Sequence, residues 1–130
     1  MAVEMTIPEV TWLKRAIAEG QTDYDWVAES STDIFKDRRV VIFALPGAFT
    51  PTCSSTHLPG YESNYESILE QDVDEVYCLS VNDSFVMNAW FQHLKVNNVK
   101  AIADGTGEFT KEKGMLTNMS AVGFNARSKR

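Results

Sequence analysis

Cysteine is scarce in this chain, since its 130 residues include only two, Cys53 and Cys78. Two cysteines do not make the disulfide framework of a small secreted domain, so a cytoplasmic, reducing location is the simplest expectation. The first residues have neither a basic start nor an apolar run, and we therefore expect no signal peptide. No stretch approaches the roughly 18 uninterrupted apolar residues of a membrane span, so no membrane partner is expected.

Positive charge is also in short supply. Twelve Lys and Arg residues stand against 18 Asp and Glu residues, which gives a formal net charge of −6 and a pI of about 4.8. This balance disfavours non-specific binding to nucleic acid or to anionic membranes. The chain also has no linker, repeat or low-complexity tract, and its length and 44% hydrophobic content predict a single domain over residues 1–130.

Three short apolar segments have the pattern of strands covered on both faces, at residues 40–45, 76–81 and 99–103. Helical spacing and capping residues predict helices at 53–70, 85–94 and 109–116. Pro59 is expected to kink the first of these helices. Strands and helices alternate along the chain, which predicts an α/β domain built on a parallel sheet.

The first 35 residues give a less regular pattern. Residues 6–12 contain Pro8 and predict a short edge strand, because proline is confined largely to the edges of sheets. Residues 13–19 have helical spacing that ends at Gly20. Residues 30–35 predict a helical turn capped by a serine.

Cys53 follows the first predicted strand and stands where the next helix begins. Reactive groups gather at the carboxyl ends of the strands in an open parallel sheet. A helix N-terminus carries partial positive charge and unpaired N–H groups, which favour a thiolate over a thiol. Thr50 can place a hydroxyl beside the sulfur, and Pro46 can shield it from water. From position alone, Cys53 is either a nucleophile or a small apolar residue that fills space.

The spacing Pro46-x-x-x-Thr50-x-x-Cys53 after a buried strand resembles the peroxidatic motif of peroxiredoxins. The surrounding PGAFTPTCSSTHLPGYE is similar to the peroxiredoxin-5 subfamily, including its bacterial forms fused to glutaredoxin. The resemblance continues through CLSVNDSFVMNAW, ADGTGEFTKEKGM and GFNARSKR, so it covers nearly all of the chain from about Trp26 onward.

This resemblance implies a thioredoxin-like fold of three layers (α/β/α) with a central mixed sheet. It also implies a thiol peroxidase, in which Cys53 attacks hydrogen peroxide or an organic hydroperoxide and becomes a sulfenic acid. Thr50 would hydrogen-bond the peroxide, Pro46 would shield the thiolate and Arg130 would supply positive charge, with Arg127 the weaker candidate. Family members continue past the arginine that Arg130 matches, so we expect the sequence to be truncated and to lack the C-terminal elements.

The same resemblance implies no cofactor but an external thiol reductant. Cys78 lies inside a predicted strand and is expected to be an inert core residue. The subfamily's resolving cysteine falls in the region this chain lacks. The expected reductant is therefore glutathione with glutaredoxin, and thioredoxin is less favoured. Relatives dimerise around the active site, so we expect a homodimer with Phe49 and Phe85 at its interface.

Two other classes of function stay open at this stage. If its site is incomplete, the chain would be a non-catalytic thioredoxin-fold module, either a redox sensor or a binding fragment. A Cys–His acyl-transfer enzyme would pair Cys53 with His57, but no third orienting residue is apparent. A closed zinc site would need Cys53, Cys78, His57 and His93 together, and a buried Cys78 argues against it.

Overall fold

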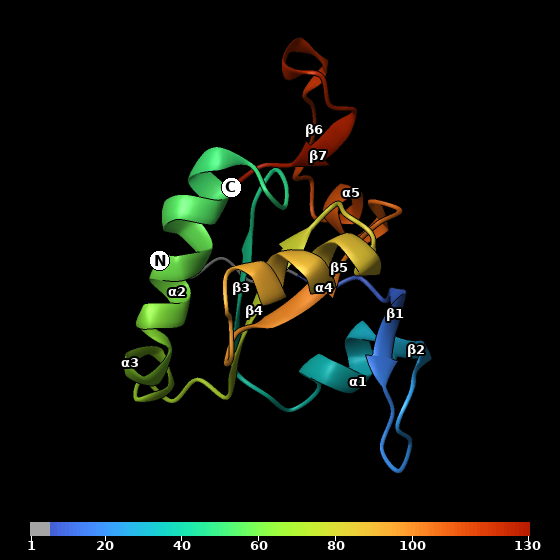
Figure 1. The fold of residues 1–130 in the computed structure, drawn as a ribbon, viewed down its shortest axis with the longest axis vertical. Coiled ribbons are helices and arrows are strands. Elements are labelled where there is room, and N and C mark those ends of the chain that lie inside the picture. Colours follow the sequence, from blue (N-terminus) through green and yellow to red (C-terminus); the bar gives the residue numbers. More distant parts are fainter. Residues whose placement is uncertain (1–5) are drawn as a thin grey trace.

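The computed structural model describes residues 6–130 and has a parallel central sheet with helices around it (Figure 1). The sheet has the order β3-β4-β5 and consists of β3 (Val40–Ala44), β4 (Glu75–Ser80) and β5 (Lys100–Ala103). The three predicted strands are confirmed to within one residue at each end. Successive residues of β4 face different layers, since Cys78 belongs to one core cluster and Leu79 to the other. This burial on both faces explains the unbroken apolar pattern.

One layer packs on each face of the central sheet. The first contains the helical segment η1 (Cys53–His57), α2 (Leu58–Ser63) and α3 (Tyr65–Leu69), together with α4 (Ser84–His93). The core on this side includes Phe43, Leu45, Cys53, Leu58, Val76, Cys78, Met87, Trp90 and Val99. The second layer contains α1 (Ser31–Phe35), α5 (Glu108–Glu112) and the N-terminal strand. Its core is made by Val10, Trp12, Tyr77, Leu79, Ile102 and Phe109.

The helix that follows β3 is divided where the sequence predicts one helix with a kink. Its first part is a π-helical turn, η1, in which the N–H of Leu58 donates to the carbonyl of Cys53. Pro59 is the next residue after Leu58 and has no N–H to donate. The π-helical turn therefore lies where one hydrogen bond of a regular α-helix would be missing. A second interruption falls at Asn64, which the sequence analysis does not predict.

The edge strand predicted for residues 6–12 begins only at Thr11, and the helical prediction for residues 13–19 is wrong. β1 (Thr11–Ile17) pairs antiparallel with β2 (Tyr24–Ser30), and Gly20 lies in the turn between them at φ +79°. The helical spacing of this segment is overridden because the hairpin satisfies its backbone hydrogen bonds and buries Trp12. The capped turn before β3 is confirmed, with Ser30 Oγ accepting from the N–H of Asp33 at 3.0 Å.

The C-terminal region forms a small hairpin of its own. α5 ends at Glu112, earlier than predicted, and the left-handed Gly114 (φ +70°) turns the chain out of it. β6 (Leu116–Asn118) and β7 (Ala126–Ser128) then pair antiparallel around the short 3₁₀ turn η2 (Ser120–Val122). This hairpin projects beyond the rest of the molecule (Figure 1) and brings the last residues back to the end of the central sheet.

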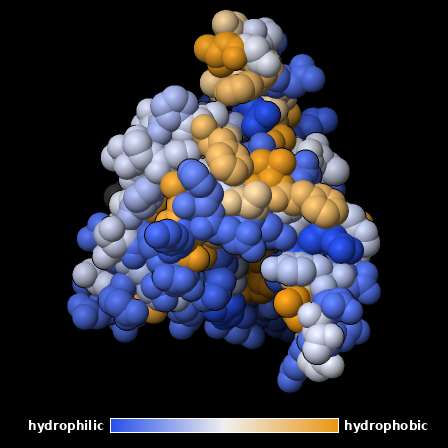
Figure 2. Space-filling model, in the orientation of Figure 1, coloured by the Kyte–Doolittle hydropathy of each residue, from blue (hydrophilic) through white to orange (hydrophobic). Residues whose placement is uncertain are grey.

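Large apolar side chains are exposed on the surface. Phe49 and Phe85 are 52% and 58% exposed, and Figure 2 shows apolar atoms gathered above the helix α4 on the face toward the viewer. The indole of Trp26 meets the ring of Phe85 edge-on, with ring centroids 5.6 Å apart. Among residues 6–130, no helix combines the length and the apolar character needed to cross a membrane.

Candidate active site

Cys53 stands in the first turn of the helical segment after β3. The ladder of this segment begins with the N–H of Ser54, which donates to the carbonyl of Thr50 at 3.0 Å. Cys53 therefore precedes the first helical hydrogen bond, where N–H groups are turned toward the helix start. Its side chain has no exposed surface and packs in the core cluster with Phe43 and Leu58.

Arg130 lies directly beside this sulfur. Its Nη2 is 3.7 Å from Cys53 Sγ, so the cation is within hydrogen-bonding distance of the thiol. The backbone N–H of Lys129, one residue earlier, donates to the carbonyl of Met115 at 2.8 Å. This bond holds the end of the chain against the residue that precedes β6. A positive charge at this distance stabilises a thiolate relative to a thiol. Arg130 thus lies next to Cys53 as the sequence predicts, and the roles of both residues stay predictions.

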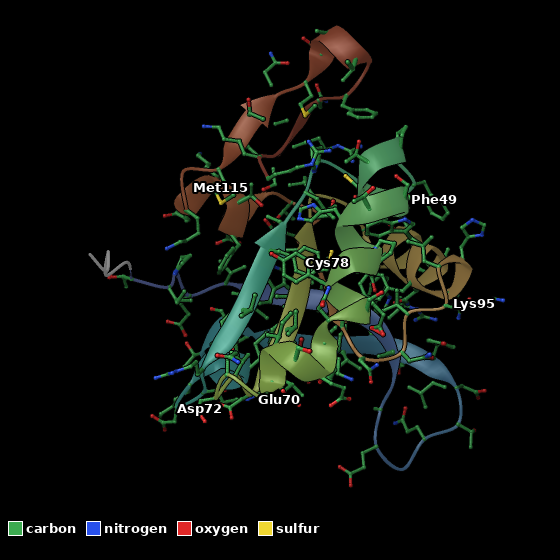
Figure 3. The ribbon with its side chains drawn as sticks, turned by 90° about the vertical axis from the view of Figure 1, so that its left-hand side faces the viewer. Phe49, Glu70, Asp72, Cys78, Lys95 and Met115 are labelled. Atoms are coloured by element: carbon green, nitrogen blue, oxygen red, sulfur yellow. The ribbon has the colours of Figure 1, made fainter. Side chains whose placement is uncertain are left out.

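Thr50 is held by its own loop. Its Oγ1 donates to the carbonyl of Gly47 at 2.6 Å, which leaves the oxygen's lone pairs to accept a hydrogen bond. Phe49 just before it has a left-handed backbone (φ +62°), so the loop is tightly turned. Its half-exposed ring lies at the margin of the molecule (Figure 3) beside the ring of His93, with centroids 5.9 Å apart. Pro46 and Gly47 are buried at the start of the loop.

Arg127 supports the loop instead of facing the thiol. Its Nη1 donates to the carbonyl of Pro46 at 3.3 Å, and its guanidinium lies 4.8 Å above the ring centroid of Phe124. A Cβ atom added to Gly47 would lie 2.8 Å from the same nitrogen, so an alanine here would push the end of the Arg127 side chain aside. The two arginines therefore have different positions: Arg130 lies against the sulfur and Arg127 against the loop.

His57 lies beside Arg130 at the edge of the site. It packs against the rings of Phe43 and Tyr61, with centroids 5.2 and 5.7 Å away, and its buried Nδ1 has no hydrogen-bond partner. Burial lowers the pKa of His57, and the charge of Arg130 lowers it further. A neutral imidazole is the result at neutral pH. In residues 6–130 no three His, Cys, Asp or Glu side chains are grouped to hold a metal ion.

Cys78 lies in the interior between the sheet and the helical segment (Figure 3). Burial raises the pKa of Cys78, and the charge of a Cys53 thiolate raises it further. Both effects keep Cys78 protonated, because a second negative charge in an apolar core is unfavourable. This agrees with the expectation of an inert thiol.

Comparison with known proteins identifies the family. The Redoxin family model matches residues 2–130. A peroxiredoxin of Rhizobium etli is 46% identical over 98% of this chain and 73% of its own length. The structure of reduced Prx3 from Vibrio vulnificus in complex with H₂O₂ superposes with a TM-score of 0.86 at 35% identity, covering 100% of this chain and 78% of that one.

The chain is a peroxiredoxin. It belongs to a family of peroxidase oxidoreductases, and the structural neighbours confirm the thioredoxin-like fold. A second relative, the hybrid peroxiredoxin hyPrx5 of Haemophilus influenzae, is 44% identical over 94% of this chain and 48% of its own length. The peroxiredoxin-5 structure from Alvinella pompejana has a TM-score of 0.81 at 30% identity and covers 100% of this chain and 79% of that one.

Sequence reasoning missed two groups that hold the peroxiredoxin loop in place. Asn82 Oδ1 accepts from the N–H of Ala48 at 3.0 Å and from the hydroxyl of Ser80 at 2.6 Å. Trp90 of α4 donates from Nε1 to Ser54 Oγ at 2.9 Å. This bond connects the turn that contains Cys53 to α4. The helical spacing of residues 85–94 indicates only that Trp90 packs in the core. A buried tryptophan's need for a hydrogen-bond partner is the signal that suggests more.

Proposed function

We propose that this peroxiredoxin reduces hydrogen peroxide and small organic hydroperoxides at Cys53. The observation that carries the proposal is the guanidinium of Arg130, 3.7 Å from Cys53 Sγ. Without a nearby cation, a sulfur with no exposed surface would be unfavourable as an anion. The position at a helix start adds unpaired backbone N–H groups as further donors.

In the proposed reaction, the thiolate attacks one peroxide oxygen. An S–O bond forms while the O–O bond breaks, and the electron pair leaves with the second oxygen. That oxygen takes up a proton and departs as water or an alcohol, and Cys53 becomes a sulfenic acid. Arg130 would stabilise both the thiolate and the growing charge on the leaving oxygen. Thr50 Oγ1 donates its hydrogen bond to the carbonyl of Gly47, so it would accept a hydrogen bond from the peroxide O–H and orient the substrate.

We propose an external thiol as the reductant, with glutathione and glutaredoxin preferred over thioredoxin. The sulfenic acid would condense with one thiol to give a mixed disulfide and water, and a second thiol would release Cys53. The support is the burial of Cys78, whose raised pKa makes it a poor resolving nucleophile. Since Cys53 is also buried, η1 would have to open before a large reductant reaches it.

We also propose a cytoplasmic homodimer that needs no cofactor. Exposed Phe49 and Phe85 support the dimer, because large apolar side chains near a site commonly mark a protein interface. The burial of Cys53 favours one alternative, a non-catalytic redox-sensing or binding module whose thiol meets peroxide only slowly.

A competition assay tests the peroxidase function. Hydrogen peroxide is shared between the chain and a reference peroxidase, and the sulfenic acid is trapped with a specific reagent. We expect Cys53 to react much faster than free cysteine, Cys53→Ser to abolish the reaction and Cys78→Ser to retain it. If Cys53 is no faster than free cysteine, the non-catalytic alternative is preferred. If Cys78 is the residue that is trapped, the assignment of the nucleophile is wrong.

A further inference from the structure

A large cleft lies at the far end of the central sheet from Cys53. It has a volume of about 850 Å³ and lies between the β1–β2 hairpin, the beginnings of β4 and β5 and the end of α4. Glu75 and Lys100 are the first residues of β4 and β5, whereas Cys53 follows the carboxyl end of β3. Because these strands are parallel, the cleft and the thiol are at opposite ends of the sheet.

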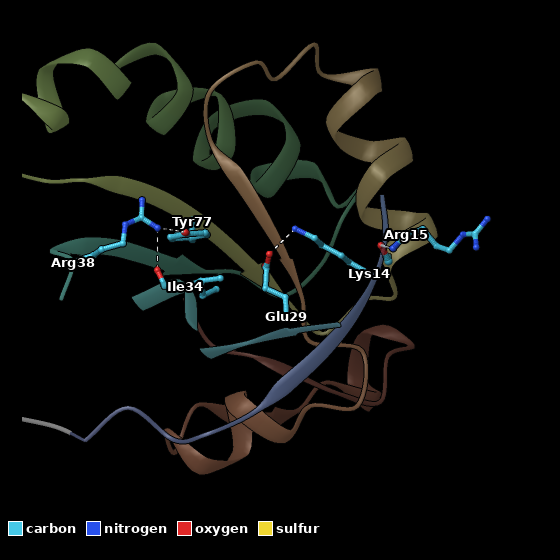
Figure 4. A network of polar contacts seen from close by, with 7 residues as sticks. Lys14, Arg15, Glu29, Ile34, Arg38 and Tyr77 are labelled. Atoms are coloured by element: carbon cyan, nitrogen blue, oxygen red, sulfur yellow. Dashed lines mark hydrogen bonds and ion pairs between the residues drawn. The ribbon is translucent and has the colours of Figure 1, made fainter. Parts of the chain in front are cut away.

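The charge of this cleft is opposite to that of the whole chain. Five of the 12 Lys and Arg residues line it, compared with two of the 18 Asp and Glu residues, although the net charge of the chain is −6. Glu29 is paired with Lys14 at 2.6 Å (Figure 4), whereas Glu75 accepts from the neutral hydroxyl of Tyr65 at 2.7 Å and keeps its negative charge. The cations outnumber the carboxylates, so a local excess of positive charge remains after both carboxylates are counted.

Three cations remain for a ligand. The guanidinium of Arg15 turns away toward the rings of Trp26 and Phe85 and does not count here. Arg38 is positioned by its Nη1, which donates to the carbonyl of Ile34 at 3.0 Å and to the hydroxyl of Tyr77 at 3.1 Å (Figure 4).

Lys95 and Lys100 supply the other two charges. Both are exposed, and within residues 6–130 neither takes part in an ion pair. The end of α4 would repel an anion, but carbonyls there already accept hydrogen bonds from the backbone N–H groups of Leu94, Lys95 and Val96. The carbonyl groups at the end of α4 therefore do not cancel the attraction of Lys95 and Lys100 for an anion.

The interior of the cleft is apolar and partly aromatic. The residues that form its apolar floor are Phe91 of α4, Val96 and Val99 of the following loop and Ala101 of β5, and Ile34 and Tyr77 line the cleft from the opposite face of the sheet. An apolar floor with a few charged groups at the margin is the usual construction of a small-molecule site, and the volume is within the usual range. A flat ring suits such a floor, and phosphate groups suit Lys and Arg side chains.

We propose that this cleft binds a nucleoside polyphosphate, with the ring over the apolar floor and the phosphates toward Arg38, Lys95 and Lys100. This site is separate from Cys53 and does not depend on the proposed peroxidase function.

Calorimetric titration of the full chain with ATP, in the absence of divalent metal, tests the proposal. We expect saturable binding that weakens as salt is added, because exposed charges are screened. The double variant Lys95→Ala/Lys100→Ala should bind at least about tenfold more weakly, since two charge-assisted contacts are removed. The matched control Lys36→Ala/Lys111→Ala loses the same charge elsewhere on the surface and should bind like the parent.

Several results would overturn the proposal: no saturable binding of ATP, an equal loss of affinity in both double variants, or adenosine binding as tightly as ATP. Tripolyphosphate as tight as ATP would refute the ring site on the floor. Circular dichroism of the double variants checks that each folds, and Arg38→Gln, which keeps a polar side chain, provides a second test if one of them does not. The rate of reaction with peroxide should be the same in all these variants.

Discussion

Replacement of Arg130 by glutamine removes the charge nearest to Cys53 and keeps a polar side chain. Two unit charges 3.7 Å apart attract by about 1 kcal/mol in bulk water and by about 4 kcal/mol at an effective dielectric constant near 20. Arg130 is exposed to solvent, so the effect should lie near the lower value, about 1–2 kcal/mol. Each 1.4 kcal/mol is about tenfold in rate, so peroxide should oxidise Cys53 about 5- to 30-fold more slowly.

The rate of sulfenic acid formation in the competition assay measures this effect. Lys129→Gln is the matched control, because it removes one positive charge from the neighbouring residue and leaves its backbone hydrogen bond to Met115 intact. Arg130→Lys should recover part of the rate, since it keeps the charge and loses the planar guanidinium. A rate for Arg130→Gln within twofold of the parent, or an equal loss in Lys129→Gln, would refute the electrostatic reasoning.

Two further changes test the support of the site, and a third tests a carboxylate that stabilises the fold elsewhere. Gly47→Ala should displace the end of the Arg127 side chain from the loop, because the new Cβ would lie 2.8 Å from Nη1. The hydrogen bond to the carbonyl of Pro46 would be lost, so we expect a cost of about 1 kcal/mol in thermal unfolding and a slower peroxide reaction, and an unchanged melting temperature would contradict this. Trp90→Phe removes the hydrogen bond to Ser54 and should increase proteolytic cleavage near Cys53, with Ser54→Ala showing the same direction if that bond is responsible. Burial alone would raise the pKa of Glu62, but hydrogen bonds from the N–H groups of residues 97–99 outweigh it and lower the pKa below the ordinary 4.5. The carboxylate of Glu62 therefore stabilises the folded state above pH 4.5, and this stabilisation is lost as the pH falls through the folded-state pKa. Glu62→Gln should lower the free energy of unfolding in denaturant by about 1 kcal/mol at pH 7 and by less at pH 3.5. An equal loss at both pH values would refute this.

The sequence predicts elements well where burial imposes a simple period. β3, β4 and β5 are apolar at almost every position because helices or strands cover both faces, and this pattern is local. α4 is similarly clear, since Asp83 caps its first turn by accepting from the N–H of Val86 at 2.9 Å. The β1–β2 hairpin was mispredicted because its helical spacing is overruled by pairing across the turn at Gly20.

For the site, the sequence by itself predicts Cys53 as the nucleophile and determines the loop that precedes it. Pro46, Thr50 and Cys53 lie within eight consecutive residues, so a strand followed by a helix start is enough to bring them together. Their chemistry and spacing also determine the resemblance to the peroxiredoxin family. These are properties of a short segment, and local pattern is sufficient for them.

Only the tertiary structure decided what surrounds the sulfur. Arg130 is 77 residues away in sequence, and its contact with Cys53 depends on how the β6–β7 hairpin returns to the end of the central sheet. The anchoring of Ser54 by Trp90 and the gathering of Lys95, Lys100 and Arg38 at one cleft likewise join distant segments. Such contacts arise from the packing of whole elements, and the periodicity of one segment holds no information about which distant residue will face it.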